Sequence, residues 1–270
     1  DVYKRQFPAN RVGAVVYSHQ GLSYGGLVTS SKTSLHTTGQ LYITLLEFLK
    51  RNQITTVRLK LFPSFYASYA SNEATYLMFV LKAKKVKCDV TLAIDQGATV
   101  GFNKNKKRNV IAAKNKSLII AESSDFCLFW KDVLEPNLKE THGIVPVHTY
   151  DEMGFLHRFY KDHIRLFTVF EENEIVAGAV LYISKQVAHV QYMSANEKGK
   201  KSAALDFLMN DLINVKYAHK KIFDFGVVND GQGINWGLTY WKESFGAQAY
   251  CQDTYEIDTN SSVYLKELIG

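Results

Sequence analysis

The chain has 270 residues, of which 46% are hydrophobic and 21% charged, and its formal net charge is +6. This length exceeds the size at which one core stops growing, so we expect two domains, and the composition excludes an extended disordered region. No apolar run is long enough to span a bilayer, which predicts a cytoplasmic protein without stable membrane insertion. Three distant cysteines favour a reducing compartment and predict neither a disulfide framework nor a metal site.

Much of the positive charge is local, in lysine-rich runs at 82–87, 104–108 and 198–201. A positive balance fits a nucleic-acid partner, an anionic cofactor, an acidic membrane surface or a solvated face. We interpret the first two runs as exposed surface. The third differs because of its place in the order of elements.

The first half of the chain alternates strand and helix patterns. A β-branched run at 11–17 predicts a strand and leads into a polar, glycine-rich loop at 19–26. Gly143 and Pro146 interrupt both periodicities, so we divide the chain into domains 1–141 and 142–270. Apolar spacing predicts the remaining elements of the first domain: helix 40–51, strand 55–62, helix 73–85, strand 88–94, helix 103–114, strand 117–121 and helix 124–139.

The second half opens with a capping box, in which Thr149 stands at the cap and Glu152 three residues later. After that helix, short connections join three runs, which predicts antiparallel hairpins of strands 164–171, 174–184 and 187–194. Strand alternation places His189 and Gln191 on one face and Tyr192 on the other. The basic glycine turn at 197–201 then precedes the last predicted elements: helix 202–218, strand 222–227, helix 234–245 and strand 249–257.

This order, with a basic turn between a strand and a long helix, resembles the fold of the GNAT acyltransferases. In that superfamily the amides of the turn hold the pyrophosphate of the acyl donor. A helix N-terminus presents unpaired N–H groups and the positive end of a dipole, so the placement is physically sound. The resemblance makes Lys198, Gly199, Lys200 and Lys201 candidates for donor binding, although the family turn is usually richer in glycine and led by Gln or Arg.

Two further segments resemble the FemAB-like branch of that superfamily. They are His-Gln-Gly-Leu-Ser-Tyr-Gly-Gly at 19–26 and Asn-Trp-Gly-Leu-Thr-Tyr-Trp-Lys-Glu-Ser-Phe-Gly at 235–246, the latter preceded by Asp-Phe-Gly at 224–226. The resemblance covers nearly all of 11–257. It implies an α/β fold of tandem GNAT-like domains with mixed central sheets flanked by helices, the first on the acceptor side and the second on the donor side. Relatives place further elements before the 19–26 loop, so we expect an N-terminally truncated first domain.

The resemblance also implies an activity. It predicts an N-acyltransferase that passes an acyl or aminoacyl group to an amine of a cell-envelope sugar or a peptidoglycan-type precursor. An acyl-CoA donor such as acetyl-CoA is slightly favoured over aminoacyl-tRNA, because the long charged helical arm of several tRNA-using members is missing. The acceptor, the pathway and the oligomeric state are not indicated.

Acyl transfer to an amine needs a neutral nucleophile, a stabilised oxyanion and a protonated leaving group. The resemblance implies that Lys242 stabilises the oxyanion. Lys242 adjoins a predicted buried stripe of Trp236, Leu238, Trp241 and Phe245. The resemblance gives Asp224 the orientation or deprotonation of the amine, while Tyr192 is a candidate to protonate the leaving group. Substrate contacts are expected from Gln20, Tyr24, Gly25, Gly26, Tyr66, His189, Gln191, Asn235 and Trp241.

A nucleic-acid-binding module without catalysis is the alternative from another class. It would use residues 104–116 on phosphates and aromatic side chains on bases. The lysine runs contain almost no interleaved aromatic residues, however, and the aromatic residues fall in apolar-periodic elements. The enzyme interpretation is therefore favoured.

Overall fold

A computed structural model describes residues 5–67, 71–98, 100–230 and 233–270. The chain forms two compact units, unit 1 with Asp1–Val90 and Tyr250–Gly270, and unit 2 with Thr91–Ala249. It passes between them within strands β4 (Lys84–Asp95) and β12 (Gln248–Asp258). This division differs from the expected boundary near residue 141, because β5 (Leu118–Ser123) pairs with β6 (Ile164–Glu171) and so joins unit 2.

Unit 1 contains strands in the order β1-β2-β3-β12-β4. The predicted strand at 11–17 is instead a tight hairpin of β1 (Asn10–Val12) and β2 (Val15–Tyr17). Gly13 makes this turn with a φ of 60°, a left-handed conformation that glycine adopts without steric cost. Strand β3 (Thr56–Lys60) runs parallel to β2 and antiparallel to β12.

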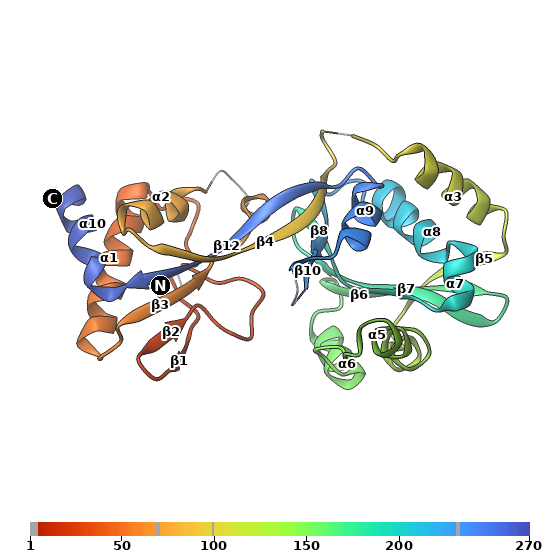
Figure 1. Cartoon of the computed structure of the whole chain (residues 1–270), viewed down its shortest axis with the longest axis horizontal. Coiled ribbons are helices and arrows are strands. Elements are labelled where there is room, and N and C mark those ends of the chain that lie inside the picture. The colour runs from red at the N-terminus through yellow and green to blue at the C-terminus, as the bar shows by residue number, and fades with distance from the viewer. Residues whose placement is uncertain (1–4, 68–70, 99, 231–232) are drawn as a thin grey trace. The chain divides into compact units, whose positions relative to one another are not determined.

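Three helices cover the sheet of unit 1: α1 (Leu35–Arg51), α2 (Glu73–Val80) and α10 (Ser262–Ile269) (Figure 1). Their apolar side chains meet those of the strands in one core, which includes Tyr42, Leu46, Leu77, Leu265 and Ile257. Helix α1 begins earlier than predicted because Ser34 caps it by accepting from the Thr37 N–H. Helix α10 and the short 3₁₀ turns η1 (Ser64–Tyr66) and η4 (Thr259–Ser261) were not predicted.

Unit 2 contains strands in the order β4-β9-β8-β7-β6-β5. The predicted antiparallel hairpins are confirmed in β6, β7 (Glu174–Ile183) and β8 (Val187–Ala195). Strand β9 (Ile222–Val227) runs parallel to β8, but the two pair only where Val187–His189 face Ile222–Asp224. Both strands continue beyond this point, so they part just after His189 and Asp224.

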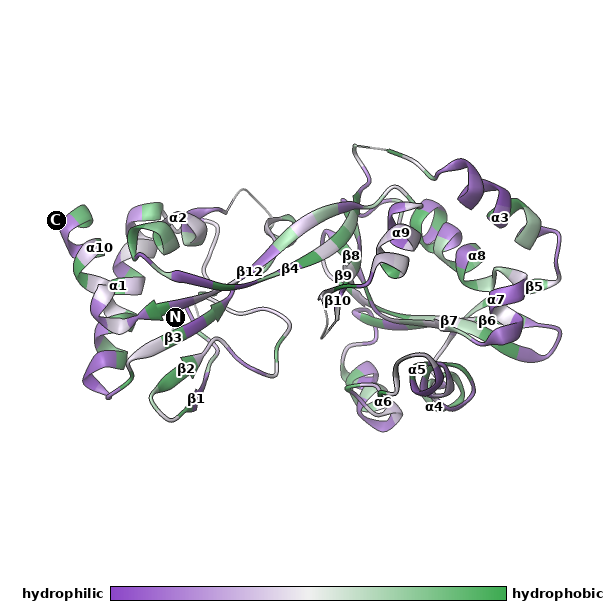
Figure 2. Cartoon of the chain, in the orientation of Figure 1, coloured by the Kyte–Doolittle hydropathy of each residue, from purple (hydrophilic) through white to green (hydrophobic). Residues whose placement is uncertain are grey.

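Helices cover both faces of this sheet (Figure 1). On one face lie α4 (Phe126–Phe129), the π-helical turn η2 (Trp130–Leu134), α5 (Glu135–His142) and α6 (Tyr150–Phe159), which begins with the predicted capping box. On the other lie α3 (Lys104–Lys114), α7 (Glu197–Ser202), α8 (Ala204–Asp211) and α9 (Trp236–Glu243). Figure 2 shows that α3 is largely hydrophilic.

The predicted helix at 202–218 is broken. Ala203, with a φ of 55°, separates α7 from α8, and the second piece ends in the π-helical turn η3 (Leu212–Lys216). A short hairpin of β10 (Asn229–Asp230) and β11 (Gly233–Ile234) precedes α9 and was not predicted. Within the described ranges, no helix combines the length and apolar character needed to cross a bilayer.

Candidate active site

Asp224 lies at the point where β8 and β9 part, with only 1% of its surface exposed. Its Oδ1 accepts hydrogen bonds from the Thr91 hydroxyl (2.9 Å) and the Gly226 backbone N–H (2.8 Å). Its Oδ2 lies 2.8 Å from Nδ1 of His189. Three donors therefore stabilise the ionised carboxylate. Because Asp224 is enclosed in this way, it is placed to orient His189.

His189 is held in one tautomer by this contact. A carboxylate only accepts hydrogen bonds, so Nδ1 of the neutral ring carries the proton and Nε2 is an acceptor. Gly226 allows the contact, since it has a φ of 74° and any Cβ there would lie 3.2 Å from Cε1 of His189. The Asp-Phe-Gly sequence thus supplies both the carboxylate and the space for the imidazole.

Lys242 lies on α9 and is 2% exposed. Its Nζ donates to the carbonyl oxygens of Gly226 (3.0 Å) and Val227 (2.9 Å), at the end of β9. Burial lowers the pKa of Lys242 to about 8, against the opposing effect of the negative charge of Asp224. The third N–H of the ammonium has no acceptor among the residues that the structure describes. This buried cation can therefore donate one further hydrogen bond.

The predicted apolar stripe of α9 is wrong in one respect. Trp236 is 72% exposed, whereas Thr239 and Lys242 occupy the buried positions of the helix. Asn235 caps the helix by accepting from the Leu238 N–H (2.9 Å), so its side-chain oxygen is engaged. Within α9 the buried positions thus belong to a threonine and a cation.

A β-bulge changes the faces of β8. Val190 faces Leu181 of β7 and Tyr192 faces Val180, so Gln191 is an extra residue between them. Side chains alternate from one residue to the next, and an inserted residue shifts the alternation by one. Tyr192 therefore shares the face of His189, which corrects the alternation predicted from sequence, and Gln191 does not.

Tyr192 is partnered on that face. Its hydroxyl lies 2.7 Å from Nδ1 of His148 and accepts from the His148 backbone N–H at 3.2 Å. Its ring stands edge-on to Trp130, whose Nε1 donates to the His148 carbonyl at 3.0 Å. Burial raises the pKa of Tyr192, which keeps its proton on the hydroxyl. These contacts tie Tyr192 to the aromatic core under α4 to α6.

The basic turn forms the first turn of α7. Asn196 caps it, with its Oδ1 accepting from the Gly199 N–H at 2.9 Å, and a Cβ on Gly199 would lie 2.1 Å from the Val176 carbonyl oxygen. Lys198 pairs with Glu174 (3.1 Å) and Glu172 (3.4 Å). Gly199 is therefore required for helix-to-strand contact, and an exposed acidic pair already engages Lys198.

A second charged network fixes α9 against α3 and α8. Lys106 is 5% exposed and donates to Oδ1 of Asp206 at 2.7 Å, and Nε1 of Trp241 donates to the same oxygen at 2.9 Å. The Lys106 ammonium also lies 4.9 Å from the Trp241 ring centroid and 4.3 Å from that of Phe245. Trp241 thus contacts the scaffold that positions Lys242. Asp206 stands amid an apolar helical pattern, which was the signal in the sequence for this network.

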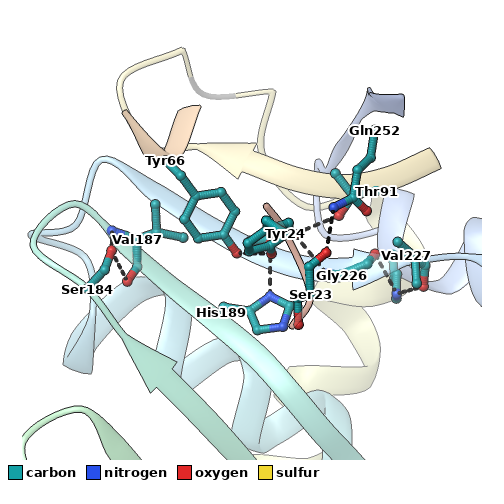
Figure 3. Close-up of polar contacts among 12 residues, drawn as sticks. Ser23, Tyr24, Tyr66, Thr91, Ser184, Val187, His189, Gly226, Val227 and Gln252 are labelled. Atoms are coloured by element: carbon teal, nitrogen blue, oxygen red, sulfur yellow. Dashed lines mark hydrogen bonds and ion pairs between the residues drawn. The ribbon is translucent and has the colours of Figure 1, made fainter. Parts of the chain in front are cut away.

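The candidate residues of unit 1 separate into two groups. Gly25 and Gly26 line a cavity of ≈490 Å³. Tyr24 and Tyr66 join their hydroxyls at 2.9 Å (Figure 3). Gln20 does not line the cavity and pairs with Asn10, whose Nδ2 donates to its Oε1 at 2.7 Å. Across the described part of the chain, no group of His, Cys, Asp and Glu is arranged to hold a metal ion.

Comparison with solved structures places this geometry in a known fold. The crystal structure of FemX matches with a TM-score of 0.66 and 12% identity over 93% of this chain and 85% of that chain. The chain has a fold similar to that of FemX. L-PGS from Bacillus licheniformis matches with a TM-score of 0.62 and 12% identity, covering 99% of this chain and 86% of that chain.

A third structure supports the same assignment. The C-terminal domain of a putative lysylphosphatidylglycerol synthetase from Agrobacterium fabrum matches with a TM-score of 0.60 and 12% identity, over 98% of this chain and 84% of that chain. No family model and no curated protein sequence matches the chain. At such identity the likeness concerns the fold alone, which confirms the expected mixed sheets flanked by helices.

Proposed function

We propose that the protein is an N-acyltransferase that passes an acyl or aminoacyl group to an amine of a cell-envelope sugar or a peptidoglycan-type precursor. The observation that carries this proposal is the buried Lys242, with one N–H left to donate, beside the His189–Asp224 pair of a FemX-like fold. An oriented imidazole and a desolvated cation are the groups that aminolysis of an ester or thioester requires.

The proposed steps use these groups in turn. The acceptor amine attacks the donor carbonyl carbon and forms a C–N bond, while Nε2 of His189 takes a proton from the attacking nitrogen. Asp224 stabilises the resulting imidazolium through Nδ1. The oxyanion accepts from the third N–H of Lys242. When the C–S or C–O bond breaks, the leaving group takes the electron pair and then the proton held by His189.

In this scheme Asp224 is a positioning residue, and His189 takes the proton that the sequence-based interpretation gave to Asp224. Tyr192 stays a candidate proton donor to the leaving group. Its hydroxyl would have to exchange its contact with His148 for one with the leaving group. His189, in contrast, keeps its Nδ1 contact with Asp224 when Nε2 transfers the proton.

For the donor we favour acyl-CoA, bound by Lys198, Gly199, Lys200 and Lys201. Helix α8 begins shortly after these residues at Ala204, with Ala203 at its N-cap, and no side chain caps it. An uncapped helix start offers N–H groups to phosphate oxygens. Lys201 has no ion-pair partner among the described residues, and the pairs of Lys198 and Lys200 with glutamates are exposed and weak. A phosphate can compete for these lysines.

An aminoacyl-tRNA donor is the second candidate. One similar structure is named a putative lysylphosphatidylglycerol synthetase, a name that describes a lysyl group joined to a lipid. The same Lys242 and His189 chemistry serves an aminoacyl ester, whose leaving group is a hydroxyl. The two donors therefore differ in how they are bound and share the transfer step.

The test is to incubate the protein with acetyl-CoA or charged tRNA and a panel of amino sugars and wall precursors, and to look for acylated product by mass spectrometry. We expect product with one donor, and loss of that product in Lys242→Met. Lys221→Met, a lysine outside the site, serves as the control. Absence of product with both donors across the panel, or full turnover by Lys242→Met, would contradict the proposal.

A further inference from the structure

The cavity of unit 1 has a volume of ≈490 Å³ and lies within that unit alone. Its walls come from the loop after Gly25, from α1, from the segment between β3 and η1, from the start of α2 and from β12. Gly25 brings the loop close to the sheet, because its N–H donates to the Lys60 carbonyl at 2.8 Å. A Cβ at Gly25 would lie 1.9 Å from the Ser18 carbonyl oxygen, so only glycine fits there.

The lining combines hydroxyl groups with apolar side chains. Leu27, Leu61, Phe62 and Pro63 supply apolar surface. Hydroxyl groups both donate and accept, and they come from Thr29, Ser31, Thr33, Thr38, Tyr42, Ser64, Ser71 and Thr75. Such a surface can contact both the C–H groups and the hydroxyl groups of a polyhydroxylated ligand.

The charge of the lining is negative. Glu73 and Asp253 are its acidic members, and no lysine or arginine lines the cavity in the part of the chain that the structure describes. This contrasts with the net charge of +6 of the whole chain. A phosphate in the cavity would meet carboxylates without a guanidinium or ammonium to pair with, which is unfavourable in a partly desolvated site.

Asp253 has an unused acceptor. Its Oδ2 pairs with Nζ of Lys85 at 2.6 Å and accepts from the Tyr255 hydroxyl at 3.1 Å. Its Oδ1 is buried and has no hydrogen-bond partner among the described residues. Burial raises the pKa of Asp253, but the hydrogen bonds from Lys85, Cys88 and Tyr255 and the charge of Lys85 together outweigh this and hold the pKa below its usual value, so the carboxyl is ionised at neutral pH.

A buried charged oxygen without a donor costs on the order of 1–3 kcal/mol, and a ligand cation in the cavity offsets part of this cost through its charge. Glu73 adds a second carboxylate at the start of α2, where its Oε2 accepts the Ser71 hydroxyl at 3.1 Å. Together the two carboxylates favour a ligand that donates from a cationic group.

We propose that this cavity binds a hydroxyl-rich ligand that carries an ammonium group and no phosphate, with its charge at Glu73 and Asp253. This inference goes beyond the proposed function and does not depend on it, and the ligand that it points to is a free amino sugar and not a nucleotide-linked one. The two carboxylates favour a cationic ligand over a neutral or anionic one. The hydroxyl groups of the lining orient the sugar ring of that ligand through hydrogen bonds.

Three probes with the same sugar ring separate the effect of the ammonium group from that of a phosphate. They are glucosamine, glucose and glucosamine 6-phosphate. Isothermal titration of the full chain without an acyl donor should give the tightest binding for glucosamine. A charged hydrogen bond of about 1.5–3 kcal/mol predicts a preference over glucose of roughly tenfold to a hundredfold. Glucosamine 6-phosphate should bind more weakly than glucosamine.

Two variants test whether the preference for glucosamine over glucose arises in the cavity. Glu73→Gln and Asp253→Asn should each reduce the glucosamine-over-glucose ratio at least several-fold. Glu256→Gln, on the same strand β12 but paired with Arg58 and outside the cavity, should keep it. If Asp253→Asn misfolds because Lys85 loses its partner, Glu73→Gln decides the question alone.

The proposal is overturned if glucosamine 6-phosphate binds as tightly as glucosamine, if the ratio survives Glu73→Gln, or if none of the three probes binds at millimolar concentration. Because binding is measured without an acyl donor, the measured affinities do not depend on whether the protein catalyses acyl transfer. Selective glucosamine binding without any acyl transfer would refute the proposed activity and leave the cavity assignment intact.

Discussion

The two units treat polar groups in opposite ways. In unit 2 the charges of the candidate site and its supporting network have partners: Asp224 accepts hydrogen bonds from three described donors, Lys242 donates two, and Lys106 pairs with Asp206. In unit 1 the cavity is lined by many hydroxyl groups and two carboxylates, and Oδ1 of one of them, Asp253, has no hydrogen-bond partner among the described residues. A satisfied network holds its geometry before a ligand arrives, whereas an unsatisfied one gains from binding.

This difference separates reaction from recognition. Preorganised charges are suited to stabilise a transition state, since they need not rearrange during the reaction. Open hydrogen-bonding groups are suited to select a ligand, since a wrong ligand leaves them unpaired. Substitutions in unit 2 should therefore change turnover, and those in the cavity should change affinity.

The largest expected effect concerns His189. Replacing it with Gln keeps an N–H for Asp224 but removes the proton acceptor, so turnover should fall by about 100-fold to 10,000-fold. Binding of the cavity probes should stay unchanged. His163→Gln, an exposed histidine of unit 2, is the control for steady-state kinetics. A loss no greater in His189→Gln than in the control would remove the histidine from the mechanism.

Lys242 should give opposite pH trends for activity and stability. Its pKa is lowered from 10.5 to about 8 in the folded protein, so above pH 8 the unfolded chain binds the extra proton. The contribution of this group to the unfolding free energy should thus rise between pH 8 and 10.5, by at most about 3 kcal/mol. Turnover should fall over the same range as the ammonium is lost.

Lys242→Met tests both trends. Turnover should drop by about 100-fold to 1,000-fold, as for loss of one oxyanion donor. The unfolding free energy at neutral pH should change little, because losing the desolvation cost offsets losing two hydrogen bonds. Chemical denaturation and pH–rate profiles measure the two effects. A wild-type turnover that stays flat or rises through pH 9 would contradict a role for the charged form.

The Lys106–Asp206 pair should matter mainly for stability. Lys106→Met leaves a buried carboxylate short of its cation, at a cost of about 3 kcal/mol in unfolding free energy. The double variant Lys106→Met with Asp206→Leu should recover most of that loss. Lys107→Met, an exposed lysine on the same helix, serves as the comparison. Equal denaturation midpoints for Lys106→Met and Lys107→Met would show that the pair contributes nothing.

The smallest effect is expected at the basic turn. Replacing Lys198, Lys200 and Lys201 by Ala should raise the KM for the donor by roughly tenfold and weaken its salt dependence, since their charges are exposed and screened. The KM for the acceptor should not move. Replacing Lys104, Lys107 and Lys114 of α3 controls for net charge. Equal increases for donor and acceptor would argue against a donor site here.

Local patterns predicted most elements of the fold. Alternation and short connections predicted β6 to β8, and the capping box at Thr149 predicted the start of α6. Apolar spacing also gave the order of the other helices and strands. The sequence pattern did not predict the helix break at Ala203, because alanine favours helix locally. Only tertiary packing holds this residue in the left-handed conformation.

The candidate site was predicted in part. Asp224, His189 and Lys242 were singled out, but their mutual contacts depend on which strands pair and where they part. Burial of Lys242 and Lys106 was not predictable from runs of basic residues, because a lysine turns inward only where a distant carboxylate or carbonyl meets it. Glu73 and Asp253 lie far apart in the chain, so no local pattern joins them.

The bulge at Gln191 affects how relatives of this chain are aligned. It adds one residue to β8 between His189 and the start of α7, so a relative with a regular strand there is one residue shorter. An alignment without a gap inside this strand would then match either the histidine or the following helix, but not both. Profiles built with a one-residue gap at Gln191 should therefore recover homologues that ungapped comparison at about 12% identity misses.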